Sequence, residues 1–526
     1  MTSERIAWAF VLLAGCSSAP PPAPPPPPVA VEATVEAASP EPKVKAPPKL
    51  RVPRPRLELQ ADHGVPGMYM GGVATADFDE DGRADVVMAG YFEKRCLDAQ
   101  QICQPGIEVR VFLSRSKKGG PIRFEQKQRY KDIGVCAAQV VVGDFDGDGH
   151  ADFAFEVREG VDTSAYFGRG DGTFKRTILE KNFGNHSTSM GLAAADVDRD
   201  GKDDLIFNSS GEAEHYKAGE ALWYRWTGKR WRGMQKDFSH RMSYGGTIAA
   251  GDLTGDGYPE IAVGGNAGAP FGTYYCENLL YGQVHENKRG KIAKEAMAVV
   301  ANFALKHYGR ASADEAPNPK RFANRCLGGD NLQYVIADVD RDGHNDIISA
   351  GSAGFLGRRD MPGEAHYSFA ILRNVDGTGK NFVTWENEGM GPDGKAGHNF
   401  GDSTNTGAGN VDLQSIAVGD LNGDGWPEIF LQGHRRDWEK NPGGYKFDTL
   451  FFVNQADGTW QWDDSVLGLQ RDFGEGGGVI ADFDGDGWND LLVSGAEEPF
   501  HSNGNNPDDK NTPETIVTHV FAGKKP

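Results

Sequence analysis

The stretch ADFDGDGWNDLLVSG, residues 481–495, places Asp482, Asp484, Asp486 and Asp490 at positions one, three, five and nine of a short loop. Alternate residues of a tight turn direct their carboxylates toward one point, and Gly487 at position six permits the sharp bend. Ca²⁺ takes about six to eight oxygen ligands, so this spacing suits a hard cation. The apolar run after the loop predicts a buried strand.

The same pattern occurs seven times, and we number the loops 1 to 7 in chain order. The predicted ligands at positions one, three, five and nine are Asp77, Asp79, Asp81 and Asp85 in loop 1; Asp144, Asp146, Asp148 and Asp152 in loop 2; Asp196, Asp198, Asp200 and Asp204 in loop 3; Asp252, Thr254, Asp256 and Glu260 in loop 4; Asp338, Asp340, Asp342 and Asp346 in loop 5; Asp420, Asn422, Asp424 and Glu428 in loop 6; and Asp482, Asp484, Asp486 and Asp490 in loop 7.

An EF-hand is excluded because that motif requires a bidentate glutamate at position twelve and helices on both sides of the loop. Position twelve is here Met88, Phe155, Phe207, Val263, Ser349, Leu431 and Val493, none of which is a carboxylate. The loops therefore join strand to strand.

The chain has 526 residues and a formal net charge of −20, with 70 glycines. A regular repeat over this length predicts one closed array of repeats rather than several unrelated domains. Strong acidity disfavours nucleic-acid binding. Because much of the acidity lies in the loops, calcium in all seven would neutralise more than half of it. The pattern thus predicts up to seven structural Ca²⁺ ions.

The first residues resemble an export signal. Residues 1–15 contain Arg5 and a short apolar run, and Leu13-Ala14-Gly15-Cys16 resembles a bacterial lipobox. The resemblance implies cleavage before Cys16 and lipidation of that cysteine, and Ser17 is compatible with sorting to the outer membrane. An ordinary secretory signal or a buried segment is the alternative. The run is too short to span a bilayer.

Residues 16–56 are rich in proline, which predicts an extended polyproline II tether without a core. From residue 57 four short extended segments repeat; in the first unit they are 72–77, 85–88, 108–113 and 122–126. Four-stranded antiparallel units repeated radially are propeller blades, and seven loops predict an all-β, seven-bladed propeller over residues 57–526. The last unit lacks an outer strand, which residues 57–60 are expected to supply, removing the open edges.

These features together resemble FG-GAP repeats. The residues that carry the likeness are the seven loops, the strands DLLVSG (490–495) and EIAVGG (260–265), and Gly268-Ala269-Pro270 with Phe271-Gly272. FG-GAP repeats build the seven-bladed propeller of integrin α subunits and of many bacterial VCBS-type surface proteins. The resemblance implies this fold and calcium in the loops, and it says little about a ligand.

Strands in a blade alternate in direction, so the long connections mostly fall on the face opposite the metal loops. Binding residues are usually carried by loops on a rigid scaffold. The predicted ligand-binding residues are His366, Tyr367, His398, Phe400, His434, Arg435, Trp438 and His501. The alternative is that they are ordinary solvated or self-packed loop residues.

One helical insertion is predicted at residues 291–308, where Ile292, Ala296, Val299, Val300, Phe303 and His307 follow helical spacing. Its role would be to cover the disc or to dock a partner. Besides Cys16 the chain has Cys96, Cys103, Cys136, Cys276 and Cys326. Cys96 with Cys103 and Cys276 with Cys326 are possible disulfides in an oxidising compartment, with Cys136 left free.

The sequence favours a monomeric, calcium-stabilised binding or adhesion protein, anchored by lipid at the bacterial outer membrane or cell surface. Its partner would be a protein or a polysaccharide, with no nucleic acid and no membrane contact beyond the lipid. A polysaccharide-active, lyase-like enzyme on the same propeller is the alternative. A structural envelope or assembly factor is a third hypothesis. No catalytic signature such as G-x-S-x-G occurs.

Overall fold

The structure is a computed structural model that describes residues 50–92, 96–97, 102–103, 107–131, 139–155, 163–180, 188–210, 220–236, 247–264, 281–301, 327–355, 368–385, 411–437, 444–468, 473–474, 476–497, 500–501 and 515–525. The chain divides into two units, Met1–Ala46 and Pro47–Pro526, and every described residue belongs to the second.

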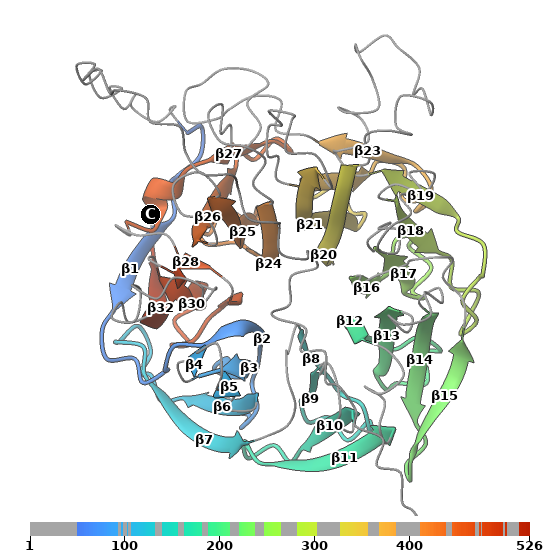
Figure 1. Cartoon of the computed structure of the whole chain (residues 1–526), viewed down its shortest axis with the longest axis horizontal. Coiled ribbons are helices and arrows are strands. Elements are labelled where there is room, and N and C mark those ends of the chain that lie inside the picture. Colours follow the sequence, from blue (N-terminus) through green and yellow to red (C-terminus); the bar gives the residue numbers. More distant parts are fainter. Residues whose placement is uncertain are drawn as a thin grey trace, which may run out of the picture. The chain divides into compact units, whose positions relative to one another are not determined.

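The described residues form seven antiparallel four-stranded blades arranged in a ring (Figure 1). Blade 1 contains β2 (Tyr69–Ala76), β3 (Asp85–Tyr91), β6 (Glu108–Ser114) and β7 (Phe124–Tyr130). Blade 2 contains β8 (Val140–Gly143), β9 (Asp152–Phe155), β10 (Thr163–Gly168) and β11 (Phe174–Glu180). Blade 3 contains β12 (Thr188–Ala195), β13 (Asp204–Ser210), β14 (Glu220–Trp226) and β15 (Trp231–Lys236). Blade 4 contains β16 (Ile248–Gly251), β17 (Glu260–Val263), β18 (Tyr281–His285) and β19 (Ala298–Ala301).

Blade 5 contains β20 (Leu327–Ala337), β21 (Asp346–Phe355), β22 (Ser368–Asn374) and β23 (Phe382–Trp385). Blade 6 contains β24 (Val411–Gly419), β25 (Glu428–Asp437), β26 (Gly444–Asn454) and β27 (Trp460–Trp462), and the short β31 (Phe500–His501) pairs with β26. Blade 7 contains β29 (Gly478–Ala481), β30 (Asp490–Glu497), β32 (Thr515–Lys524) and β1 (Arg56–Gln60), with β28 (Phe473–Gly474) beside β30. Strands β4 (Cys96–Leu97) and β5 (Ile102–Cys103) form a separate two-stranded sheet.

The ring is closed by the two ends of the propeller chain. Strand β1 pairs antiparallel with β32, with Leu57 opposite Gly523 and Leu59 opposite Phe521. The first strand therefore supplies the outer strand of the last blade, as predicted, and the all-β seven-bladed fold is confirmed.

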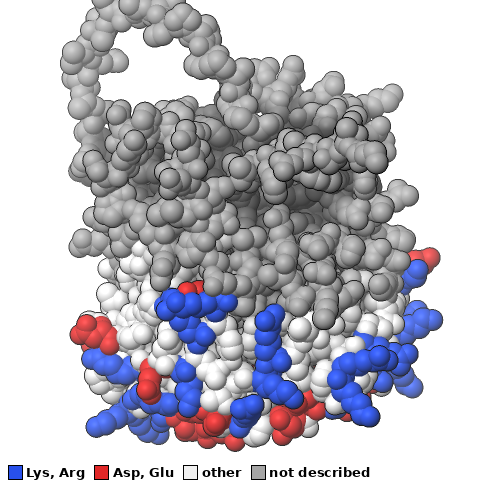
Figure 2. All heavy atoms as spheres, turned by 60° about the horizontal axis from the view of Figure 1, so that its bottom comes forward, with Lys and Arg blue, Asp and Glu red and all other residues white. Residues whose placement is uncertain are grey.

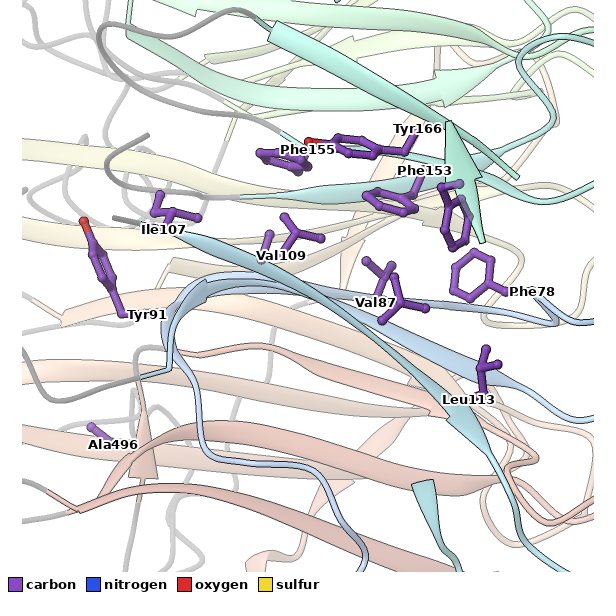
Figure 3. Packing of buried hydrophobic residues seen from close by; sticks show 13 residues of the cluster. Phe78, Val87, Tyr91, Ile107, Val109, Leu113, Phe153, Phe155, Tyr166 and Ala496 are labelled. Atoms are coloured by element: carbon purple, nitrogen blue, oxygen red, sulfur yellow. The ribbon is translucent and has the colours of Figure 1, made fainter. Parts of the chain in front are cut away.

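The core consists of seven apolar clusters, one between each pair of neighbouring blades. Figure 3 shows the cluster between blades 1 and 2, where Phe78 and Val87 from blade 1 lie near Phe153 from blade 2. Phe78 and Phe153 form an edge contact with ring centroids 6.4 Å apart. Phe78 occupies position two of loop 1, and the apolar residue at position two of every other loop is likewise part of a core cluster. This residue therefore anchors each loop in the core.

The residue five positions before each loop lies where two neighbouring blades meet near the centre of the ring. The size of its side chain sets the distance between the two backbones. Gln139 Oε1 accepts a hydrogen bond from Leu192 N of the next blade at 2.7 Å, and Ser415 Oγ accepts one from Gly478 N at 3.1 Å. In blade 1 this position is Gly72, where an added Cβ would lie 2.8 Å from Val140 N of blade 2. The glycine thus allows direct backbone packing between blades 1 and 2.

The predicted helical insertion is wrong over its described part, because residues 298–301 form β19, the fourth strand of blade 4. Val299 and Val300 pair with Gln283 and Gly282 of β18. Starting a short helix is costly, whereas the edge of β18 offers ready hydrogen-bond partners to β-branched residues. Phe303 and His307 lie outside the described residues. In the described part of the chain no helix could span a membrane.

Residues 50–56, the end of the predicted tether, contact blade 6. Leu50 and Val52 pack on the cluster between blades 6 and 7. Arg54 forms an ion pair with Asp463 at 2.5 Å, and Asn422 Nδ2 donates to the carbonyl oxygen of Pro53 at 3.1 Å. The chain is therefore attached to the ring before β1 begins.

Candidate metal-binding loops

The residue at position one closes each loop by accepting backbone hydrogen bonds. Asp482 Oδ1 accepts from Gly485 N at 2.7 Å, and its Oδ2 accepts from Gly487 N at 2.8 Å. Gly487 has a φ of +94°, a left-handed conformation that glycine adopts without a Cβ penalty. All seven loops share the bond from the position-six glycine to position one.

The position-five carboxylate also bonds to its own loop. Asp486 Oδ1 accepts from Trp488 N at 2.9 Å, and all seven loops make the corresponding bond from the position-seven N–H. One oxygen of this side chain therefore stabilises the turn.

The carboxylate at position nine lies buried between the loop and the third strand of its blade. In loop 1, Asp85 is fully buried, and its Oδ2 accepts from Phe78 N at 2.8 Å while its Oδ1 accepts from Ser114 N at 2.7 Å. Asp490 makes the equivalent bonds with Phe483 N and Gly523 N, both at 2.8 Å. Because a carboxylate oxygen has two lone pairs, these bonds leave capacity for a cation.

Five loops bring the ligands at positions one, three and nine together, with one oxygen from each residue within 4.8 Å of the others. These triads are Asp77, Asp79 and Asp85; Asp144, Asp146 and Asp152; Asp196, Asp198 and Asp204; Asp338, Asp340 and Asp346; and Asp482, Asp484 and Asp490. The position-five residues Asp81, Asp148, Asp200, Asp342 and Asp486 are not part of them.

Unpartnered buried oxygens test whether the triads fit a cation. Asp79 Oδ1, Asp146 Oδ1 and Asp198 Oδ1, all at position three, have no hydrogen-bond partner among the described residues. In loop 3 the fully buried Asp204 also leaves Oδ1 without a partner there. Leaving a buried acceptor unsatisfied is costly, and hard oxygen donors are the ligands that Ca²⁺ prefers. The donor set therefore fits calcium.

Burial makes these carboxylates resist ionisation in the metal-free protein. Desolvation raises the pKa of Asp85, Asp152, Asp346 and Asp490 to about 7 and that of Asp204 to about 8, with nearby carboxylates adding to the effect. A bound divalent cation favours the charged form and removes this penalty.

In loops 4 and 6 the position-nine glutamate accepts the usual bond from position two and a further one from the residue at position three. Glu260 Oε2 accepts from the backbone N–H of Thr254, at 3.2 Å, and position three has no carboxylate there. In loop 6, Asn422 Nδ2 donates to Glu428 Oε1 at 3.1 Å. Burial raises the pKa of Glu260 to about 7 and that of Glu428 to about 8. Among the described residues neither loop forms a triad of acidic ligands.

Sequence reasoning did not identify three arginines that contact position three. Arg115 Nη1 lies 2.8 Å from Asp79 Oδ2, Arg373 Nη1 lies 3.6 Å from Asp340 Oδ2, and Arg225 pairs with Asp198. All three follow or end the third strand of their blade, which is the signal that could have revealed them. Figure 2 shows acidic side chains gathered along one edge with Lys and Arg side chains beside them.

The predicted ligand-binding residues are described only in part. His434 and Arg435 were predicted to lie in a long connection, over residues 433–445, but they lie in β25, and the described residues of that range, 433–437 and 444–445, are all strand. The physical reason is that β25 and β26 pair along their whole length, with Arg435 opposite Lys446. His501 lies in β31 and pairs with Gly444 of β26. His366, Tyr367, His398, Phe400 and Trp438 lie outside the described residues, as do Cys16, Cys136, Cys276 and Cys326.

These three residues come together at the level of the backbone. Strand β25 begins at Glu428, the position-nine residue of loop 6, so its far end at Asp437 lies away from the metal loop. Strands β25, β26 and β31 are adjacent there. Cys96 and Cys103 lie opposite each other in β4 and β5.

Two family models match parts of the chain. The FG-GAP-like repeat family matches residues 157–207, and the FG-GAP repeat family matches residues 244–274. Among solved structures, the biofilm matrix protein Bap1 of V. cholerae is 12% identical, with 90% of this chain and 91% of that chain covered and a TM-score of 0.36.

The Tc holotoxin pore of Photorhabdus luminescens is 13% identical over 84% of this chain and 18% of that chain, with a TM-score of 0.31. These two likenesses are too weak to carry any argument about function. No curated protein is a significant match. Two segments of the chain thus match FG-GAP repeats, and their described residues belong to the seven-bladed β-propeller.

Proposed function

We propose that this protein is a calcium-stabilised binding protein, held at the bacterial outer membrane or cell surface by lipid on Cys16. Calcium in the five triad loops fixes the ring. The opposite face then presents its connections to a protein or polysaccharide partner. The metals would be structural, because the position-nine carboxylate that would hold each of them is buried and bonded to backbone groups of its blade.

The observation that carries the proposal is the set of unpartnered buried carboxylate oxygens in the triads. Each triad gathers three carboxylates, and in loops 1, 3 and 5 one arginine beside position three balances only part of that charge, so a bound cation would supply the missing counter-charge and a partner for the unsatisfied oxygens. The adjacent strands β25, β26 and β31 support the binding face, because they bring His434, Arg435 and His501 to one end of blade 6.

The calcium part is tested by thermal unfolding of the purified protein with Ca²⁺ and with a chelator. We expect a large fall in Tm in chelator, and a smaller gain from Ca²⁺ in the double variant Asp482→Asn and Asp484→Asn. Asp171→Asn is the matched control, since Asp171 is an exposed turn residue outside the triads. Equal melting with and without chelator would refute the proposal.

The binding part is tested by screening the purified protein against glycans and cell-envelope extracts, with and without Ca²⁺. A partner that binds this face should be lost when His434, Arg435 and His501 are changed to alanine together. The control changes exposed Lys117, Lys118 and Arg230 to alanine. Loss of partner binding in the control variant alone would show that the partner binds another face of the protein. Anchoring is tested separately by Cys16→Ser, which should release the protein from the membrane fraction.

A further inference from the structure

Neighbouring metal loops are joined by hydrogen bonds that end on residues at ligand positions. Asp203, at position eight of loop 3, donates its N–H to the carbonyl of Asp144 at 2.8 Å, and its Oδ2 accepts from Asp144 N at 2.9 Å. Asp144 is the position-one residue of loop 2. Between loops 7 and 1, Ala84 N donates to the carbonyl of Asp482 at 3.1 Å.

A second set of bonds links blades 1 and 2 to the loop of the blade before each of them. Ser114 N bonds to Asp85 of its own loop, while its Oγ donates to the carbonyl of Phe483 in loop 7 at 2.6 Å. Phe483 N in turn bonds to Asp490 at 2.8 Å. One residue thus connects the position-nine ligands of two neighbouring loops. Gly172 N connects blade 2 to loop 1 through the carbonyl of Phe78 at 2.9 Å.

The triads are not spread evenly around the ring. Loops 7, 1, 2 and 3 are consecutive, because β1 closes blade 7 and Ala84 bonds to Asp482, and all four contain a triad. Loop 5 also has a triad but lies between loops 4 and 6, which form none among the described residues. Asn345 Nδ2 of loop 5 donates to the carbonyl of Asp252 at 2.8 Å, as Asn489 Nδ2 of loop 7 does to that of Asp420 at 2.9 Å, so both bonds lead to a loop without a triad. Loop 7 differs in that it is also bonded to loop 1, which has a triad.

We propose that loops 7, 1, 2 and 3 bind calcium cooperatively as one unit, and that loop 5 binds calcium independently. A cation that orders one loop fixes the carbonyl to which the next loop is bonded, so the next cation orders less chain on binding. Loop 5 gains less such help, since loops 4 and 6 on either side of it hold only one neutral oxygen ligand each at position three and form no triad of acidic ligands among the described residues. This inference rests on the proposed calcium binding and deepens it by assigning how the sites influence one another.

The test uses terbium as a luminescent substitute for calcium. Trp488 occupies position seven of loop 7, next to the predicted ligand Asp486, so it can sensitise a terbium ion in loop 7; its ring lies against Gly423 of loop 6. Because loop 6 forms no triad of acidic ligands among the described residues, we assign the signal that Trp488→Phe removes to loop 7. We expect Asp79→Asn, in loop 1, to weaken terbium binding at loop 7 at least about fivefold, the lower end of common coupling strengths.

Asp340→Asn is the matched variant, because it makes the same substitution at position three of the isolated loop 5. It should shift the loop 7 affinity less than about twofold, within the usual limit of independent sites. Equal shifts from the two variants, or no shift from Asp79→Asn, would overturn the proposal. An absence of any terbium or calcium binding by calorimetry would instead refute the proposed function itself.

Ser114→Ala tests the route of the coupling. In this background the effect of Asp79→Asn on loop 7 should fall by more than half, provided that circular dichroism shows a folded ring. A full effect in the Ser114→Ala protein would show that the Ser114 bond does not carry the coupling. Asp171→Asn serves as the baseline for the charge change, because Asp171 is an exposed turn residue outside every triad.

Discussion

Replacing Gly72 by alanine tests whether blades 1 and 2 meet through their backbones. The added Cβ would lie 2.8 Å from Val140 N and 3.0 Å from the carbonyl carbon of Gln139. Real Cβ atoms do not approach backbone this closely, so one blade must move by several tenths of an ångström. Overpacking of this kind costs about 1–3 kcal/mol.

The matched control is Gly233→Ala in β15, where the added Cβ would meet only the Tyr224 ring, at 3.4 Å. Neither glycine has a positive φ, so the two substitutions differ in available space rather than in backbone strain. Gly233→Ala should be neutral or stabilise by about 0.4–1 kcal/mol. The assay is equilibrium urea unfolding in excess Ca²⁺, which keeps metal loading constant. Equal midpoints for the two variants would refute the close blade contact.

Three further predictions concern pH, a buried amide and the closing strand. In chelator, Tm should fall as pH rises from about 5 to 8. Asp85 and Asp490 have pKa values of about 7 in the folded state, above those in the unfolded state, so the folded state binds more protons over this range and loses stability as they are released. A rising Tm would contradict the burial of these groups. Asn374→Ala should cost about 1–3 kcal/mol in urea unfolding, because the buried Nδ2 donates to the carbonyl of Leu253 at 2.7 Å, whereas exposed Asn381→Ala should cost less. Removing residues 1–46 should leave Tm unchanged, while removing residues 1–60 should lower it and cause association in size-exclusion chromatography, since the edge of β32 loses β1.

The sequence predicts the architecture because each loop shows both its spacing and the strand that follows it. Counting strands in the last unit is enough to assign residues 57–60 to the closing position. The helical spacing of Ile292, Ala296 and Val299 predicted a helix where the structure has a strand. A short apolar run fits both a helix and a strand, and its pairing with a neighbouring strand edge decides which of the two forms. His434 and Arg435 were expected in a loop for the same reason: the extent of β25 depends on its pairing with β26.

The site was predictable in residue type but not in role. Alternation places positions one, three and five on one side of the turn, yet it does not reveal that Asp486 caps Trp488 N. Position nine looked like a fourth ligand, and only the structure reveals its second task of holding Ser114 or Gly523 to the loop. The asparagine of loop 6 is predicted to offer a ligand oxygen, and the structure adds that its amide nitrogen donates to Glu428.

The pairing of β1 with β32 has a consequence for biosynthesis. Residues 56–60 leave the ribosome before any blade exists, and their partner at residues 515–524 is made after all the other strands of the propeller. Until then the nascent protein is an open arc with an unpaired strand at each extremity, a form prone to join other chains. Truncated translation products should therefore tend to associate with other chains, whichever blade they end in. The ten residues of β32 close the ring and so remove the unpaired strands from the finished molecule.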